Sequence, residues 1–354
     1  MSIPTESIGS IPRPPQLLDA LREFRLGNLS HERMEACYDE ALSDTILRFE
    51  ATGSPIISDG EQTKSSFATY PLLGLDNIVQ DGVVITFADG HTRQLPKLKK
   101  GPFKYGIHAG TYVQSAKRYA SAPIKQAVIS ASALSLLYPQ EGIPNYSQAT
   151  FIDDLVKEAV ADIRSCFEQG AHHVQVDFTE GRLSVKLDPT KALLQQFIDL
   201  NNRVLGHFTP DQQKRIGVHT CPGGDHDSTH SADVDYADLL PSLFQLNAGN
   251  FYMQLASEKN PDYVLGIIKE HIRPHQRVYI GVIDVLNQDV EEPELVRDRV
   301  LHAAEYIPVN QLGTTDDCGY SPFEDDTSTG RDVAFAKIKA RVAGTALAAN
   351  KLNI

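Results

Sequence analysis

Strand-like apolar runs alternate with amphipathic helical patterns along most of this chain, and that alternation constrains its fold more than any other feature. Residues 151–171, 189–208 and 293–307, for example, carry apolar side chains at helical spacing. Alternation repeated about eight times predicts a parallel sheet closed into a (β/α)8 TIM barrel. An open doubly wound sheet is the alternative, although no G-x-G-x-x-G supports its dinucleotide-binding version. The predicted strands are residues 7–11, 54–60, 123–130, 172–178, 215–221, 250–256, 277–284 and 309–315.

Residues 81–98 depart from this alternation. They alternate in period two around Asp89-Gly90, a pattern that predicts a β-hairpin inserted into the barrel. The chain between the first strand and about residue 50 has a charged, helical pattern, which predicts a cap or an outer helix. Because no repeat, low-complexity tract or long linker marks a second domain, we expect residues 1–354 to form a single barrel domain.

Composition and charge restrict the class of protein. The net charge of −13 argues against a general nucleic-acid binder. The chain has no apolar run of about eighteen residues that predicts a membrane span, and its N-terminus lacks the pattern of a secretory signal. Four cysteines are too few for a disulfide scaffold in a chain this long. We therefore expect a cytoplasmic protein with reduced thiols and no nucleic-acid or membrane partner. The sequence is also compatible with assembly into a homo-oligomer.

Polar side chains follow most of the predicted strands at their carboxyl ends. Barrel enzymes place their chemistry at that end of the barrel. Because several apolar strands each end in an acid, we expect these side chains to share one polar pocket. The candidates are Ser10, Glu61, Asp177, Glu180, His219, Cys221, Gln254, Asp284 and Cys318.

His219 and Cys221 are the strongest candidates for a metal site. They stand two positions apart, so an extended strand places both side chains on the same face. Cys318 leaves the eighth strand at a similar height. Two thiolates and an imidazole form a borderline-soft ligand set, for which zinc is the natural metal. The alternative is a buried cysteine beside a hydrogen-bonded histidine, and we expect His226 and His230 to be solvated loop residues.

Six short motifs match a known family in order and spacing. They are IGS (8–10), DGE (59–61), QVD (175–177), H-x-C (219–221), GVID (281–284) and DCG (317–319). Together they resemble the C-terminal catalytic barrel of cobalamin-independent methionine synthase, over nearly the whole chain. The resemblance implies a barrel that binds one zinc and activates a thiol substrate as its zinc thiolate. The full-length synthase has two barrels, whereas this chain has room for one.

The resemblance also implies roles for individual residues. The family's zinc ligands map to His219, Cys221 and Cys318. The acid that holds the amino group of homocysteine maps to Glu61, a second acid maps to Asp177, and the turn that holds the substrate carboxylate maps to Ser10. We add Asp284 and Glu180 as candidate catalytic groups, because each lies at the end of a predicted strand or just beyond it.

Three positions depart from the family's pattern. Gln254 stands where the family has a glutamate ligand, so the protein ligands would leave zinc formally neutral, a stronger Lewis acid with a less nucleophilic thiolate. Leu286 replaces a histidine that donates a proton to the leaving pterin, and that help is worth roughly 10²–10⁴-fold. The chain has no tryptophan on which a folate could stack, and Leu137 or Tyr138 stands at about that place.

The first hypothesis is therefore a zinc-dependent transferase that moves a methyl or alkyl group onto a thiol. Homocysteine is the expected acceptor, and the identity of the methyl or alkyl donor is left open. A second hypothesis keeps zinc as a Lewis acid that opens an epoxide or assists an elimination or rearrangement. A third is a non-catalytic barrel that serves as a binding or regulatory partner. A decarboxylase of the porphyrin-processing type is the most distant alternative, because its chemistry leaves the two strand-end cysteines unexplained.

Overall fold

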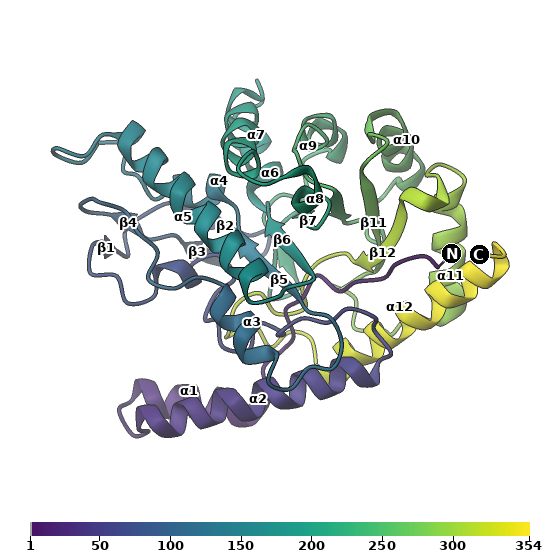
Figure 1. Ribbon diagram of the computed structural model, residues 1–354, viewed down its shortest axis with the longest axis horizontal. Helices are drawn as coiled ribbons and strands as arrows, with labels where there is room; N and C mark the ends of the chain where they lie inside the picture. The colour runs from purple at the N-terminus through teal and green to yellow at the C-terminus, as the bar shows by residue number, and fades with distance from the viewer. Residues whose placement is uncertain (1) are drawn as a thin grey trace.

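The computed structural model describes residues 2–354. Helices follow strands throughout the barrel, and several short strands stand outside it (Figure 1). The helices are α1 (Pro15–Arg25), α2 (His31–Ala51), η1 (Tyr70–Leu72), α3 (Gly110–Ala116), α4 (Ala131–Ser135), α5 (Gln148–Glu168), α6 (Glu180–Leu187), α7 (Ala192–Leu205), α8 (Pro210–Gln213), η2 (Tyr236–Asp238), α9 (Leu240–Leu243), α10 (Pro261–His271), α11 (Pro293–Ala304), η3 (Val309–Gln311) and α12 (Arg331–Lys351). The strands are β1 (Ile78–Val79), β2 (Val84–Thr86), β3 (Thr92–Gln94), β4 (Lys97–Leu98), β5 (Lys125–Ile129), β6 (His173–Asp177), β7 (Ile216–Thr220), β8 (Gly224–Asp225), β9 (Ser228–Thr229), β10 (Asn250–Met253), β11 (Arg277–Ile283) and β12 (Leu312–Asp316).

Six parallel strands form the main sheet in the order β12-β11-β10-β7-β6-β5, which follows the chain without a reversal. Thr5 adds one parallel bridge to Thr314 of β12, and Ile57 adds one to Ile124, the residue directly before β5. These two edge segments are joined where the Ile11 N–H donates to the Gly60 carbonyl at 3.0 Å. The sheet is therefore a ring of eight segments, so the predicted TIM barrel is confirmed and the doubly wound alternative is wrong.

The first barrel segment differs from the predicted strand at 7–11. Its only bridge lies at Thr5, where neighbouring backbone groups pair with Thr314 on both sides. Gly9 has a positive φ of 146°, and its carbonyl accepts a hydrogen bond from Ser58 Oγ at 2.7 Å. Residues 8–11 therefore turn across the barrel mouth instead of continuing the ladder, and the strand predicted there is wrong in its bounds.

Helices cover the outside of the sheet, as Figure 1 shows for α5, α7, α10, α11 and α12. Every residue of β5, β7 and β10 is buried, as expected for parallel strands that have side chains inside the barrel and helices outside. On α5, apolar residues recur at four-residue spacing from Phe151 to Ile163, and Ser147 caps its first turn. This face of α5 packs against Val176 and Val218, which point outward from β6 and β7.

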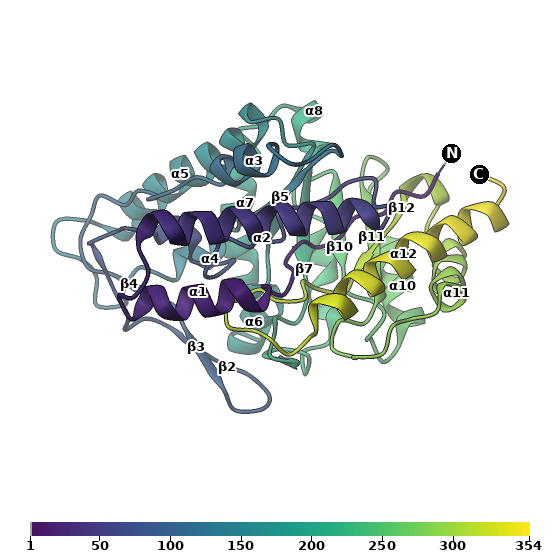
Figure 2. The ribbon, with the colours of Figure 1, turned by 90° about the horizontal axis from the view of Figure 1, so that it is seen from below.

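The predicted hairpin is confirmed. Strands β2 and β3 pair antiparallel with Ile85 opposite Arg93, and Gly90 takes a positive φ of 93° in the turn. The hairpin projects from the barrel in Figure 2. The same view shows α1 and α2 side by side along the barrel, the outer helices that the charged N-terminal pattern indicates.

A buried polar cluster fills the barrel beneath its mouth. Tyr252 donates to Glu6 at 2.7 Å, and His173 pairs with the same carboxylate at 2.9 Å. Burial alone would raise the pKa of Glu6, but the contact with His173 and the charge of Lys125 outweigh it and bring the pKa to about 2. Gly217 leaves room for the Tyr252 ring, which a Cβ would meet at 2.4 Å. The barrel interior is therefore packed, and an open site is left only at the strand ends.

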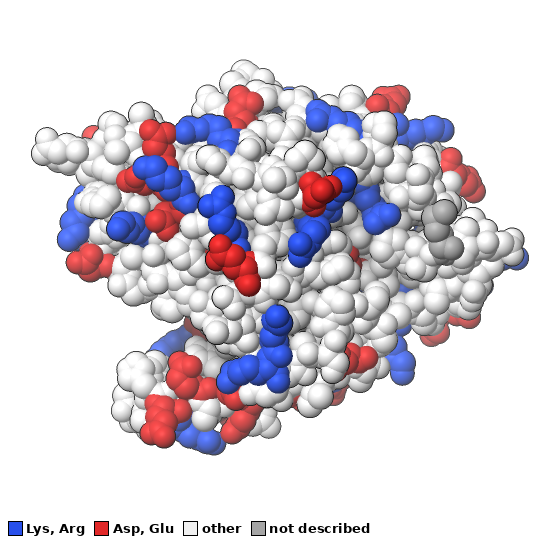
Figure 3. Space-filling model, in the orientation of Figure 1, with Lys and Arg blue, Asp and Glu red and all other residues white. Residues whose placement is uncertain are grey.

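No helix within residues 2–354 is both long and apolar enough to cross a membrane. Lysine and arginine side chains are interspersed with acidic ones over the face seen in Figure 3. No extended basic patch appears on that face.

Candidate functional site

A cavity of about 440 Å³ opens at the carboxyl ends of the barrel strands. The inward positions of β6 and β7 and the turns after the first two barrel segments form its base. Ile85, Phe87 and Leu95 of the inserted hairpin region form an apolar wall on one side. The predicted site residues that line the cavity are Ser10, Glu61, Asp177, Glu180, His219, Cys221 and Cys318.

His219, Cys221 and Cys318 offer three ligand atoms that lie within 4.8 Å of one another. The two sulfur atoms are 3.1 Å apart. His219 Nδ1 is 3.3 Å from the Tyr252 carbonyl, which can only accept, so this nitrogen carries the proton. The opposite nitrogen, Nε2, is buried without a hydrogen-bond partner. An unpartnered imidazole nitrogen beside two sulfurs fits a zinc ion.

The two thiols share their protons unequally. The Cys318 thiol donates toward Cys221, which holds the pKa of Cys221 well below its usual value and that of Cys318 well above it. The Gly223 N–H points at Cys221 Sγ over 3.3 Å and further favours the thiolate. The Cys221 thiol is therefore the readily ionised one of the pair, as a soft metal ligand requires.

Gln254 lies one residue beyond β10, in which Tyr252 stands opposite His219. Its amide Nε2 donates to Ser257 Oγ at 2.7 Å, and that hydroxyl donates to Asp317 at 2.6 Å. The amide oxygen of Gln254 is left buried and without a partner. Its place beside β7 and its free lone pairs fit the predicted fourth ligand, an oxygen donor. Gln254 is not among the residues that line the cavity.

Two carboxylates, those of Glu61 and Asp177, lie at the cavity base, where Asp177 stands next to His219 in the β6–β7 register. Glu61 forms a buried ion pair with Lys64 at 3.0 Å, and it takes a positive φ of 55°, a conformation that side chains adopt rarely. Asp177 accepts a hydrogen bond from Gln175 at 2.8 Å, stands next to His219, and forms no ion pair with a lysine or arginine within residues 2–354. Burial raises the pKa of Asp177 to about 7. This arrangement leaves Asp177 ready to gain a cationic group from a ligand.

Glu180 begins α6 and reaches the same cavity. One carboxyl oxygen accepts hydrogen bonds from Ser130, at 2.5 Å, and Ser132. The other oxygen is buried without a partner. Burial raises the pKa of Glu180 to about 7, so the group can hold or release a proton near neutrality.

The Glu180 carboxyl should make the free energy of unfolding depend on pH. Its pKa is about 7 when folded and near 4.5 when unfolded, so stability falls as pH rises between those values, by at most about 1.4 kcal/mol per unit. A Glu180→Gln variant cannot ionise, so its stability relative to the wild type should increase between about pH 5 and about pH 8. Urea unfolding at both pH values measures this. A constant difference would contradict the raised pKa.

The structure does not bring Asp284 to this cavity. The residue follows β11, and its carboxylate accepts a hydrogen bond from the Leu286 N–H at 3.0 Å, closing a local turn. It is absent from the described cavity lining. Leu286, which stands where the family has a histidine, is likewise outside that lining. Its replacement of the histidine therefore changes the turn after β11, which lies next to the cavity.

His230 is a cavity residue that the sequence analysis missed. We predicted a solvated loop histidine, but its side chain is buried and lines the cavity beside Cys221, so that prediction is wrong. The imidazole fills the space next to Gly223 and meets the ring of Phe87 edge-on at 5.4 Å. Burial lowers its pKa to about 4, so it is neutral at physiological pH. His230 directly follows the short β8–β9 hairpin. Its place in the cavity depends on how that hairpin folds, which the sequence pattern does not show.

Several known proteins are similar to this chain in sequence. Residues 3–329 match the family described as cobalamin-independent synthase, catalytic domain. The chain is 21% identical over 350 residues to a protein named methionine synthase from Sulfurisphaera tokodaii, with 99% of this chain and 94% of that one covered. It is 23% identical over 327 residues to the 5-methyltetrahydropteroyltriglutamate–homocysteine methyltransferase of Nitratidesulfovibrio vulgaris, with 90% of this chain but 39% of that longer protein covered.

A solved structure shows the same fold. The B12-independent methionine synthase from Shewanella sp. W3-18-1, solved in complex with selenomethionine, matches with a TM-score of 0.77. The alignment covers 100% of this chain and 99% of that one at 19% identity. At this identity the likeness establishes the architecture alone.

Proposed function

The chain belongs to the family of cobalamin-independent synthase catalytic domains, and from that membership we propose that it transfers a methyl group to the thiol of homocysteine, forming methionine. One observation carries the proposal. A cluster of two sulfurs and an imidazole shares a single cavity with the carboxylates of Glu61 and Asp177. Such a cavity provides one end for a thiol and another for an ammonium group.

We propose that His219, Cys221 and Cys318 hold zinc, with the free amide oxygen of Gln254 as the fourth protein ligand. When bound, zinc lowers the pKa of a substrate thiol and so supplies a thiolate nucleophile at neutral pH. The protein contributes the orientation of the site. The Tyr252 carbonyl fixes the His219 tautomer, and Asp317 fixes the hydroxyl that orients Gln254.

The acidic side of the cavity is proposed to hold the amino acid part of the substrate. Lys64 neutralises Glu61, whereas no lysine or arginine within residues 2–354 forms an ion pair with Asp177. An incoming ammonium group would favour the ionised form of Asp177 and lower its pKa from about 7. Ser10 lies in the turn over the mouth, beside Gly319, and is proposed to orient the substrate carboxylate.

Glu180 is the proposed proton donor to the group that leaves the methyl carbon. It lines the cavity, it has a free carboxyl oxygen, and its pKa of about 7 suits a general acid. Because the N. vulgaris relative is named for 5-methyltetrahydropteroyltriglutamate, a reduced methylfolate is the donor we propose to test first.

The test is an assay of methionine formation. We expect the chain, supplied with zinc, homocysteine and methyltetrahydropteroylglutamate, to form methionine, and to lose this activity when zinc is removed by a chelator. A Cys37→Ser variant, changed in α2 outside the cavity, should remain active. Bound zinc without any thiol methylation, across several methyl donors, would instead favour the Lewis-acid hypothesis.

A further inference from the structure

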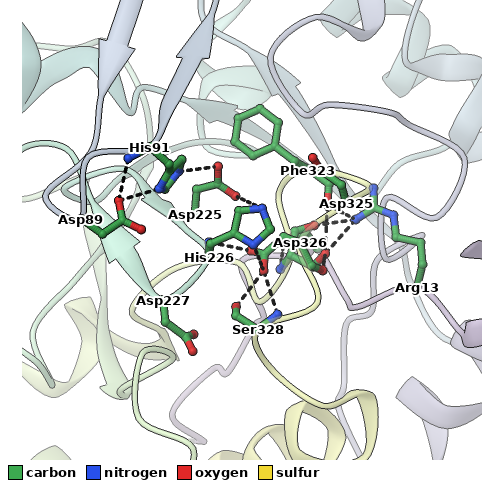
Figure 4. A network of polar contacts seen from close by, with 12 residues as sticks. Arg13, Asp89, His91, Asp225, His226, Asp227, Phe323, Asp325, Asp326 and Ser328 are labelled. Carbon is green, nitrogen blue, oxygen red and sulfur yellow. Dashed lines mark hydrogen bonds and ion pairs between the residues drawn. The ribbon is translucent and has the colours of Figure 1, made fainter.

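A second cluster of potential metal ligands lies beside the site. Asp225, His226 and Asp326 offer ligand atoms within 4.8 Å of one another. Arg93 already supplies the cation here, because its Nε and Nη2 donate to the two oxygens of Asp225 at 2.5 and 3.2 Å. Figure 4 shows Asp225 and His226 facing the acidic residues of the 323–328 loop. The cluster is therefore an ion-pair network organised by an arginine.

Arg93 also contacts the loop after β12, which carries Cys318. Its two terminal nitrogens donate to Asp325 at 3.0 and 2.8 Å, and its guanidinium lies 4.2 Å from the centre of the Phe323 ring. Asp225 follows Cys221 in the loop after β7, and Asp325 follows Cys318 in the loop after β12. One side chain of the inserted hairpin thus connects both loops.

The residues directly before Asp225 contact the sulfur atoms of Cys221 and Cys318. The Gly223 N–H points at Cys221 Sγ, and a Cβ on Gly224 would lie 3.7 Å from Cys318 Sγ. The two glycines immediately before Asp225 therefore pass against both sulfurs. The hairpin also fixes the far side of this loop, because the Ala88 N–H donates to the carbonyl of Thr229 in β9 at 2.9 Å.

We propose that Arg93 is a positioning residue for the metal site, which sets how closely the loops of Cys221 and Cys318 approach and thereby sets the affinity for zinc. The planar guanidinium binds carboxylates through pairs of nitrogens in a fixed fork geometry, whereas a lysine acts as a point charge that fixes no such geometry. Asp225 is fully buried, so this contact is shielded from solvent. The inference rests on the proposed zinc site and concerns a cavity-lining residue that is not one of the proposed metal ligands.

The test measures zinc affinity by competition with a chromogenic chelator, starting from metal-free protein. Arg93→Met should weaken zinc binding by roughly 10–100-fold, the usual effect of removing an outer-shell partner. Arg93→Lys should fall between Arg93→Met and wild type. Lys97→Met is the matched control, because Lys97 lies in the same insertion but pairs only with Asp81 and Glu141, each at 3.1 Å.

The outcomes separate this inference from the proposed function. A wild-type chain that binds no zinc overturns both. Wild-type affinity in Arg93→Met, in a protein that does bind zinc, overturns this inference alone. If Arg93→Met does not fold, Asp325→Asn tests the same connection, because the Asp325 side chain is 55% exposed and its loss disturbs little packing. Asp325→Asn should weaken zinc binding several-fold, and unchanged affinity overturns the inference.

Discussion

Replacing Cys318 by serine is expected to remove zinc binding and methyl transfer together. The change leaves Cys221 without the sulfur that lies 3.1 Å away and reduces the cluster to one sulfur and one imidazole. Loss of an outer-shell partner already costs roughly 10–100-fold in metal affinity, so loss of a ligand should cost more than 100-fold. Metal analysis of the purified variant and the rate of methionine formation measure the two effects.

The control for Cys318→Ser is Cys37→Ser, which removes a thiol from α2, far from the cavity lining. It should keep both zinc and activity. A Cys318→Ser protein that retains stoichiometric zinc would refute the proposed ligand set. Retained zinc with lost activity would place Cys318 in substrate binding instead.

Asp177→Asn is expected to lower kcat/KM for homocysteine while zinc content stays unchanged. The substitution keeps the size of a buried side chain and removes the charge that we propose pairs with the ammonium group. Truncating one partner of a buried, hydrogen-bonded charge pair costs roughly 2–5 kcal/mol, which corresponds to about 30-fold to several-thousand-fold. The same reasoning predicts weaker homocysteine binding below about pH 7, where Asp177 is protonated in the free protein.

Steady-state kinetics at varied homocysteine, together with metal analysis, measure this effect. Asp153→Asn is a matched control, since Asp153 pairs with Arg203 at 2.8 Å on the surface of α5. We expect no change in kcat/KM for that variant. A normal kcat/KM in Asp177→Asn would move the ammonium site elsewhere in the cavity.

The parts of the site that lie on regular strands were predictable from the sequence. A strand places every second side chain on one face, and this rule alone put His219 and Cys221 together at a barrel mouth. Cys318 and Asp177 follow from a second rule, because the carboxyl ends of parallel barrel strands meet at one edge. The hairpin at 81–98 was also readable from its alternation and its Asp-Gly turn.

The remaining features depend on contacts between loops, which carry no periodic signal. Arg93 meets Asp225 and Asp325 across 132 and 232 residues of sequence. His230 became a buried cavity residue only through its packing beside Gly223. Asp284 stands at a strand end as expected, yet a local turn takes up its carboxylate. Strand periodicity could not distinguish these cases.

We propose above all that this barrel binds zinc through two cysteine sulfurs and presents it to a thiol substrate. Zinc K-edge X-ray absorption, recorded with and without homocysteine, tests it most directly. We expect one zinc per chain with the sulfurs of Cys221 and Cys318 as ligands, and one additional sulfur when homocysteine is added. Absence of zinc, or a sulfur count that stays the same under saturating homocysteine, would contradict it.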